Sequence, residues 1–185
     1  MDKGFIKVGL TLIALIFLGA CNGLFGPDKT GEIQLSSETF GDTYYLFGYS
    51  YEDAEFYRFQ YQGDPLPDIF NEGYRALVGG TVKTLPGFNT PGQSNGFALL
   101  GEFSTLKSAR DFYKEYSKIE AGLQFETVSD TVKLFQVWAQ QTGIGNYVKL
   151  LVKDVQNFEG ETGAHFNEVS LEYTYQPNGS TSFTE

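Results

Sequence analysis

The sequence is poor in the side chains that bind transition metals or carry histidine-based catalysis, with one cysteine, Cys21, and one histidine, His165. A zinc site built from Cys and His needs several such ligands, and a disulfide needs two cysteines. Neither can form within one copy of this chain, so we expect no metal site. A serine nucleophile activated by His165 stays open as an alternative. We favour a half-exposed structural role for His165, which follows a glycine-containing loop.

Basic residues are also scarce, with 13 Lys and Arg against 23 Asp and Glu and a formal net charge of -10. A surface of this sign repels a phosphate backbone, which excludes nucleic acid as a partner. It also repels anionic lipid head groups, so surface charge does not hold the chain on a membrane.

Long hydrophobic segments are missing, apart from one short run near the start of the chain. Residues 8–20 are almost wholly apolar and follow the basic residues Lys3 and Lys7. A helix of this length spans about 20 Å, whereas a bilayer core is about 30 Å thick and takes about 20 residues to cross. The run is therefore too short for a stable span and is typical of a signal-peptide core. We expect residues 1–20 to be removed.

The run ends in Leu18-Gly19-Ala20-Cys21, which resembles the lipobox of bacterial lipoproteins. In that family the signal is cut before the cysteine and the thiol is acylated, so the resemblance implies lipid attachment at Cys21. Two or three acyl chains anchor a protein stably to a membrane. Asn22 stands where an aspartate favours retention in the inner membrane, so the resemblance implies the outer membrane of a Gram-negative cell and leaves its face open.

The mature chain is expected to form one domain. Residues 21–31 contain three glycines and a proline and read as the lipidated cysteine followed by a flexible tether. From residue 32 to residue 185, segments with alternating or continuous apolar residues are separated by glycine- and proline-containing loops, which is typical of β-strands. We expect a mainly β (α+β) fold, an antiparallel sheet or sandwich with one packed helix.

The expected helix covers about residues 105–118, with Ser104 as its N-cap and Gly122 as a stop. Apolar side chains fall on one face of it at spacings of three and four: Leu106, Ala109, Phe112, Tyr113 and Tyr116. The expected strands are residues 44–51, 55–61, 74–78, 81–85, 97–103, 132–142, 147–155 and 165–175.

Aromatic residues are dense between residues 44 and 61. Because neighbouring residues of a strand point to opposite faces of the sheet, we expect some of these rings to lie off the core, under another segment or on the surface. An exposed patch of that kind would mark a ligand or partner surface. The residues are Tyr44, Tyr45, Phe47, Tyr49, Tyr51, Phe56, Tyr57, Phe59 and Tyr61.

Two C-terminal segments carry a second resemblance. Residues 137–150 read Val-Trp-Ala-Gln-Gln-Thr, then Gly-Ile, then Gly-Asn-Tyr-Val-Lys-Leu, and residues 172–180 read Glu-Tyr-Thr-Tyr-Gln-Pro-Asn-Gly-Ser. Together they are similar to the HmuY-type haem-binding lipoproteins of anaerobic Gram-negative bacteria, which are β-rich and lipid-anchored. The best-known members hold haem iron with two histidines, whereas this chain has only His165. If haem binds, the resemblance implies His165 as one ligand and a tyrosine as the other.

The function expected from these observations is non-enzymatic: a lipid-anchored module of the cell envelope that binds a ligand or a protein partner. Two alternatives stay open, a HmuY-like haem-binding lipoprotein and an envelope hydrolase that uses His165 or a carboxylate pair.

Overall fold

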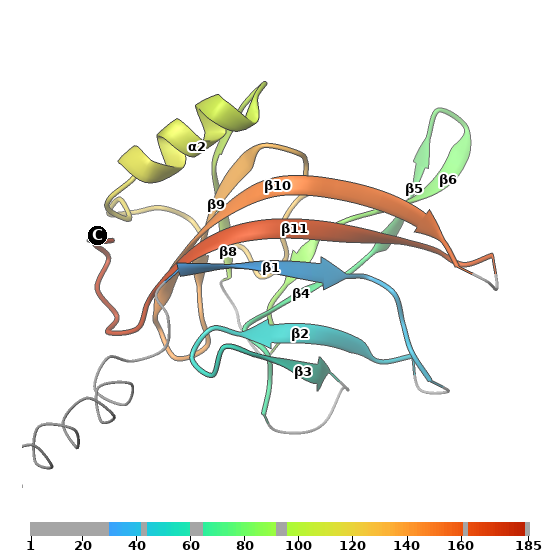
Figure 1. The fold of residues 1–185 in the computed structure, drawn as a ribbon, viewed down its shortest axis with the longest axis horizontal. Helices are drawn as coiled ribbons and strands as arrows, with labels where there is room; N and C mark the ends of the chain where they lie inside the picture. The colour runs from blue at the N-terminus through green and yellow to red at the C-terminus, as the bar shows by residue number, and fades with distance from the viewer. Residues whose placement is uncertain (1–29, 42–43, 60–64, 92–95, 161–162, 184–185) are drawn as a thin grey trace, which may run out of the picture.

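The computed structural model describes residues 30–41, 44–59, 65–91, 96–160 and 163–183. Over these residues the chain is a β-sandwich of two antiparallel sheets, with a separate hairpin and one helix (Figure 1). The expected mainly β fold with a single packed helix is confirmed.

The larger sheet, sheet A, has five strands in the order β1-β11-β10-β9-β8, and every neighbouring pair is antiparallel. Its two longest strands, β10 and β11, pair as a long antiparallel hairpin at the centre of the sheet. The strands are β1 (Thr30–Ser36), β8 (Phe97–Glu102), β9 (Gln136–Gln141), β10 (Tyr147–Glu159) and β11 (His165–Gln176).

The smaller sheet, sheet C, has four short strands in the order β3-β2-β4-β7. They are β2 (Leu46–Ser50), β3 (Glu55–Phe59), β4 (Ile69–Asn71) and β7 (Phe88–Asn89). Strands β5 (Tyr74–Val78) and β6 (Thr81–Leu85) form a separate hairpin that lies near the far ends of β10 and β11 (Figure 1). Gly79 and Gly80 make its turn with φ of 60° and 83°, as the sequence predicts.

The main core lies between sheets A and C. Val169, Leu171, Tyr173 and Tyr175 alternate along β11, and all four are buried in this core. Tyr49 and Tyr51 of the β2 segment meet them from sheet C, and the Tyr49 and Tyr173 hydroxyls lie 2.9 Å apart. Every residue of the three buried clusters lies between Ile33 and Phe183, so a chain that starts at Asn22 contains all of them.

The opposite face of sheet A is also covered, which explains why its central strands are apolar on both sides. Helix α2 (Leu106–Glu115) packs there against β10 and β9, with Ala109 and Tyr113 buried on Val137 and Leu151. The helix therefore buries the apolar face that the sequence predicts.

The ends of the helix differ from the prediction. Thr105 is the N-cap in place of Ser104: its backbone is extended, and its hydroxyl accepts the amide of Ser108 at 3.1 Å. The helix stops at Glu115, before the predicted end at Lys118, because the next residues pair with the C-terminal segment. The amide of Ile119 donates to the carbonyl of Thr181 at 2.8 Å.

Several strand limits also differ from the prediction. β1 begins at Thr30, inside the range expected for the tether, and β10 runs on to Glu159, through part of the expected loop. The segment predicted as a strand from residue 132 enters β9 only at Gln136, because Phe135 has a positive φ of 64°. Within the described residues, no helix is long and apolar enough to cross a membrane.

Candidate functional site

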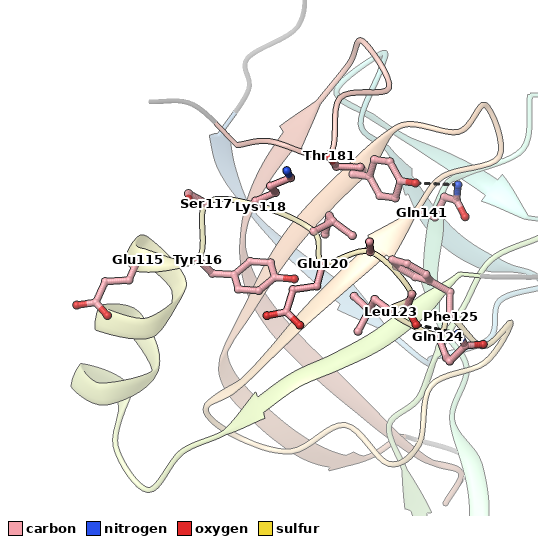
Figure 2. Close-up of a pocket in the computed structure, with 14 residues that line it drawn as sticks. Glu115, Tyr116, Ser117, Lys118, Glu120, Leu123, Gln124, Phe125, Gln141 and Thr181 are labelled. Atoms are coloured by element: carbon pink, nitrogen blue, oxygen red, sulfur yellow. Dashed lines mark hydrogen bonds between the residues drawn. The ribbon is translucent and has the colours of Figure 1, made fainter.

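A pocket of about 960 Å³ lies beyond the C-terminal end of α2, on the outer side of sheet A (Figure 2). We call it the α2 pocket. Most of its wall is one continuous segment, residues 115–125, and the rest comes from Gln141 and Tyr147 at the β9–β10 turn and from Thr181. Side chains from three separate parts of the chain therefore meet around it.

The wall of the α2 pocket is fastened to the body at several points. The amide of Ile119 donates to Thr181, and the amide of Phe183 donates to the carbonyl of Ser117, both at 2.8 Å. At the other end of the segment, Glu126 and Phe97 exchange two backbone hydrogen bonds of 2.8 and 2.7 Å. Held at both ends, the wall is formed before any ligand arrives, which lowers the entropic cost of binding.

The lining of the α2 pocket is mainly polar, and we call its apolar and aromatic side chains the floor. Ile119, Phe125 and Tyr147 line the pocket. Ile119 is buried in a small cluster with Ala98, Ala139 and Phe183, on which the half-buried rings of Phe125 and Tyr147 pack. These two rings lie 6.1 Å apart between centroids, at an interplanar angle of 46°. Their partial exposure leaves aromatic surface for a ligand to cover.

Tyr116 contributes a buried polar atom to the same wall. Its hydroxyl oxygen is buried and lies beside the backbone of Glu120. Burial raises the pKa of this hydroxyl above the ordinary tyrosine value, and the backbone of Glu120 opposes the rise.

Lys149 holds the C-terminal end of α2, where the wall of the α2 pocket begins. Its side chain is almost fully buried, and its ammonium donates to the carbonyl of Tyr116 at 2.8 Å. The ammonium also lies 4.5 Å from the ring centre of Tyr113 and 5.2 Å from that of Phe183. A cation at a helix C-terminus is favourable, so Lys149 stabilises the point where α2 ends and the pocket wall begins.

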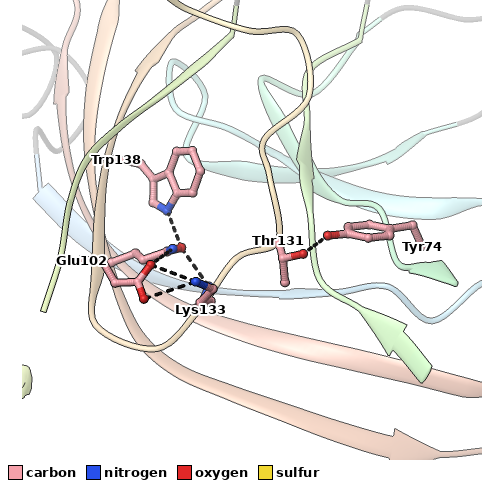
Figure 3. A network of polar contacts seen from close by, with 6 residues as sticks. Tyr74, Glu102, Thr131, Lys133 and Trp138 are labelled. Atoms are coloured by element: carbon pink, nitrogen blue, oxygen red, sulfur yellow. Dashed lines mark hydrogen bonds and ion pairs between the residues drawn. The ribbon is translucent and has the colours of Figure 1, made fainter. Parts of the chain in front are cut away.

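A second polar cluster, at the other end of the β8–β9 pair, has a structural role (Figure 3). Gln136 accepts the indole N–H of Trp138 at 3.1 Å and donates to Glu102 at 3.0 Å, and Lys133 pairs with Glu102 at 3.1 Å. The hydrogen bonds from Gln136 and Lys133 lower the pKa of the Glu102 carboxyl. The cluster satisfies the N–H of a buried tryptophan, and nearby the hydroxyls of Tyr74 and Thr131 contact each other.

His165, which the sequence singles out, lies elsewhere. Cys21 is outside the described residues. His165 is exposed at the first position of β11, opposite Glu159, and its carbonyl accepts the hydroxyl of Thr84 at 3.1 Å. Tyr147 pairs with Gln176 at the other end of β11, so eleven residues of strand, about 36 Å, separate His165 from the α2 pocket. The pocket and His165 are therefore two distinct places.

The arrangement around His165 does not form a hydrolytic triad in the described residues, where the imidazole has no hydrogen bond to a serine or a carboxylate. The sequence contains one Gly-x-Ser-x-Gly pattern, Gly92-Gln93-Ser94-Asn95-Gly96, whose residues 92–95 lie outside the described part. Strand β8 begins directly after Gly96, whereas a nucleophile elbow requires a helix at that point. The described part of the chain also holds no group of three His, Cys, Asp or Glu side chains placed to bind a metal ion.

The dense aromatics divide between the core and the surface. Tyr49 and Tyr51 are buried, whereas Tyr44, Phe47 and Phe56 are 76%, 40% and 47% exposed. Among the partly exposed rings, that of Tyr45 is covered by the guanidinium of Arg58, 3.6 Å from its centre. The exposed rings lie along β2 and β3, away from the α2 pocket, and form a separate apolar surface.

Comparison with known proteins does not extend this description: the sequence matches no known family model, and no curated protein matches it significantly.

Proposed function

We propose that this chain is a lipid-anchored, non-enzymatic binding protein of the bacterial cell envelope, and that its ligand occupies the α2 pocket. The observation that carries the binding role is the pocket itself. It has about 960 Å³ of space, a floor of partly exposed aromatic rings and a polar rim, on a wall fastened at both ends. A preformed concave site with an apolar floor and a few convergent polar groups is typical of ligand-binding sites.

The lipobox-like segment supports the anchor, and the fold relates the anchor to the pocket. Thr30, the first residue of β1, pairs with Thr174, and Tyr147 pairs with Gln176 two residues further along β11. The two residues therefore lie at the same end of sheet A, with β11 between their strands, about 10 Å apart across the sheet. The nine residue steps from Cys21 to Thr30 span at most about 30 Å. An acylated Cys21 would thus keep the pocket close to the membrane.

A ligand screen by thermal unfolding tests the proposal. The soluble chain from Asn22 to Glu185 is heated with a panel of sugars, amino acids, nucleosides, choline and haemin. A ligand that binds only the folded state raises the unfolding temperature. We expect at least one compound to do so, and the effect to disappear in Ala121→Trp, which places an indole in the α2 pocket.

Ala164→Trp is the matched control, because Ala164 is also exposed but lies beside His165 at the far end of β11. A panel in which no compound stabilises the chain contradicts the binding role. Stabilisation by haemin that survives Ala121→Trp and disappears in His165→Ala would replace this proposal with the HmuY-like function.

A further inference from the structure

The uncharged polar groups of the α2 pocket narrow the chemistry of its ligand. Gln124, Gln141 and Thr181 line the pocket together with Ser117. Amide and hydroxyl groups each offer both donors and acceptors of hydrogen bonds. The amide of Gln141 donates to the Tyr147 hydroxyl at a long 3.4 Å, and that of Gln124 donates to the carbonyl of Gly122 at 2.8 Å. A ligand that matches this rim must itself carry several groups that donate and accept.

The charges of the lining oppose an anionic ligand. Its ionisable groups are the carboxylates of Glu115 and Glu120 and the ammonium of Lys118, and the whole chain has a formal net charge of -10. Phosphate, sulfate and carboxylate ligands would enter against this field. The carboxylates can instead accept hydrogen bonds from neutral hydroxyl groups, to which Lys118 can donate.

The aromatic floor requires the ligand to have an apolar face as well. The rings of Phe125 and Tyr147 are half-buried and inclined at 46° to each other, so they offer two differently oriented surfaces. A pyranose ring meets both demands, because its C–H groups form an apolar face and its hydroxyl groups radiate from the edge.

From these groups together we infer that the α2 pocket binds a neutral sugar of one or two rings, with a ring face against Phe125 or Tyr147 and its hydroxyl groups on the polar rim. The volume of about 960 Å³ is at the upper end of the range of ligand pockets and accommodates two rings. This inference rests on the proposed function and names the ligand class of the same site.

Saturation-transfer NMR on the soluble chain tests the inference. The probes are glucose, galactose, N-acetylglucosamine, maltose, cellobiose, lactose and diacetylchitobiose at millimolar concentration, with choline and inorganic phosphate beside them. We expect transfer to the ring protons of at least one sugar. Tyr147→Ala is expected to weaken binding about tenfold through loss of the aromatic contact, and Ala121→Trp is expected to abolish it.

Two further variants separate binding from folding. Gln124→Ala changes an exposed loop side chain and is expected to weaken the same sugar, while Ala164→Trp leaves it unchanged. Saturation transfer to choline or phosphate, but to no sugar, overturns the assignment of a sugar ligand and keeps the proposed binding role. If no probe shows saturation transfer but thermal unfolding finds a non-sugar ligand, the assignment of a sugar is also overturned. If neither experiment detects a ligand, the proposed binding role is overturned as well.

Discussion

At the scale of single residues, Asp68 is the clearest case of an ionisable group shaped by its surroundings. Burial raises the pKa of its carboxyl to about 6, and the charges of Glu52 and Asp53 act in the same direction. The amide of Tyr51 donates to the carboxyl at 2.9 Å and opposes the rise. Burial therefore makes the ionised form unfavourable in the folded state.

The pH dependence follows from that shift. Between about pH 4 and about pH 6 the folded chain holds more protons on Asp68 than the unfolded chain, so the free energy of unfolding falls as the pH rises. Asp68→Asn keeps an acceptor for Tyr51 and removes the charge. We expect it to flatten this part of the pH profile and to raise stability at neutral pH by on the order of 1–2 kcal/mol. Urea unfolding across the pH range measures this, with exposed Asp130→Asn as the control that keeps the slope.

Asn71 is a fully buried amide that ties both sheets together. Its amide nitrogen donates to the side chain of Asn167 at 2.7 Å and to the carbonyl of Leu35 at 3.3 Å, and its oxygen accepts the amide of Gly87 at 3.3 Å. Asn71→Ala removes these hydrogen bonds and leaves the groups that formed them buried. We therefore expect the free energy of unfolding to fall by about 3 kcal/mol. Asn157→Ala, at an exposed position, is the control, and equal unfolding midpoints for the two variants would contradict this role.

At the scale of the elements, the N-cap of α2 distinguishes Ser104 from Thr105, two neighbouring hydroxyl residues that are equally plausible caps in the sequence. Thr105 holds the amide of Ser108, whereas Ser104 lies one position too early to do so. Thr105→Ala is therefore expected to destabilise the protein by about 1 kcal/mol, and Ser104→Ala to change it little. Thermal unfolding of the two variants shows which residue is the N-cap. A larger loss of stability in Ser104→Ala would contradict the cap at Thr105 and support Ser104, as the sequence predicts.

The elements that the sequence predicts well are those with a complete local pattern. The β5–β6 hairpin consists of two short strands that flank Gly79-Gly80, and both strands match the prediction to the residue. β4 and β7 are only three and two residues long, which is too short for any periodicity to register. β1 follows a glycine-rich stretch and becomes a strand through its pairing with β11 over Thr30–Ser36, a contact far away in sequence.

At the scale of the whole molecule, the α2 pocket could not be predicted from local patterns. Its wall follows a helix, its floor includes Tyr147 after the β9–β10 turn, and Thr181 comes from the C-terminal segment. Residues 115–125 carry no motif, and although Gln141 and Tyr147 fall in the HmuY-like segment 137–150, that resemblance did not single them out. The antiparallel order of sheet A and the pairing of Ile119 with Thr181 bring these stretches together. The only hint of the pocket in the sequence was that the apolar face predicted for the helix extends to Tyr116, one residue beyond the end of α2. His165 attracted attention by its rarity and lies at the opposite end of β11.

The anchor is a property of the whole molecule that the lipobox-like segment predicts. Cys21→Ala is expected to abolish incorporation of labelled fatty acid in cells and to release the protein from the membrane fraction, because the substitution removes the thiol that we propose as the acylation site. Asn22→Ala keeps the thiol and is expected to retain the label. Labelling of the Cys21→Ala variant at the level of the unchanged chain would refute the anchor.

The most direct test of the account is an NMR map of the backbone amides with a ligand from the screen. The account predicts ligand-induced shifts that gather in residues 115–125 and at Gln141, Tyr147 and Thr181, with His165 and the β5–β6 hairpin unchanged. Shifts centred on His165, on the hairpin or on the exposed aromatics of β2 and β3 would contradict it and move the binding site to that surface.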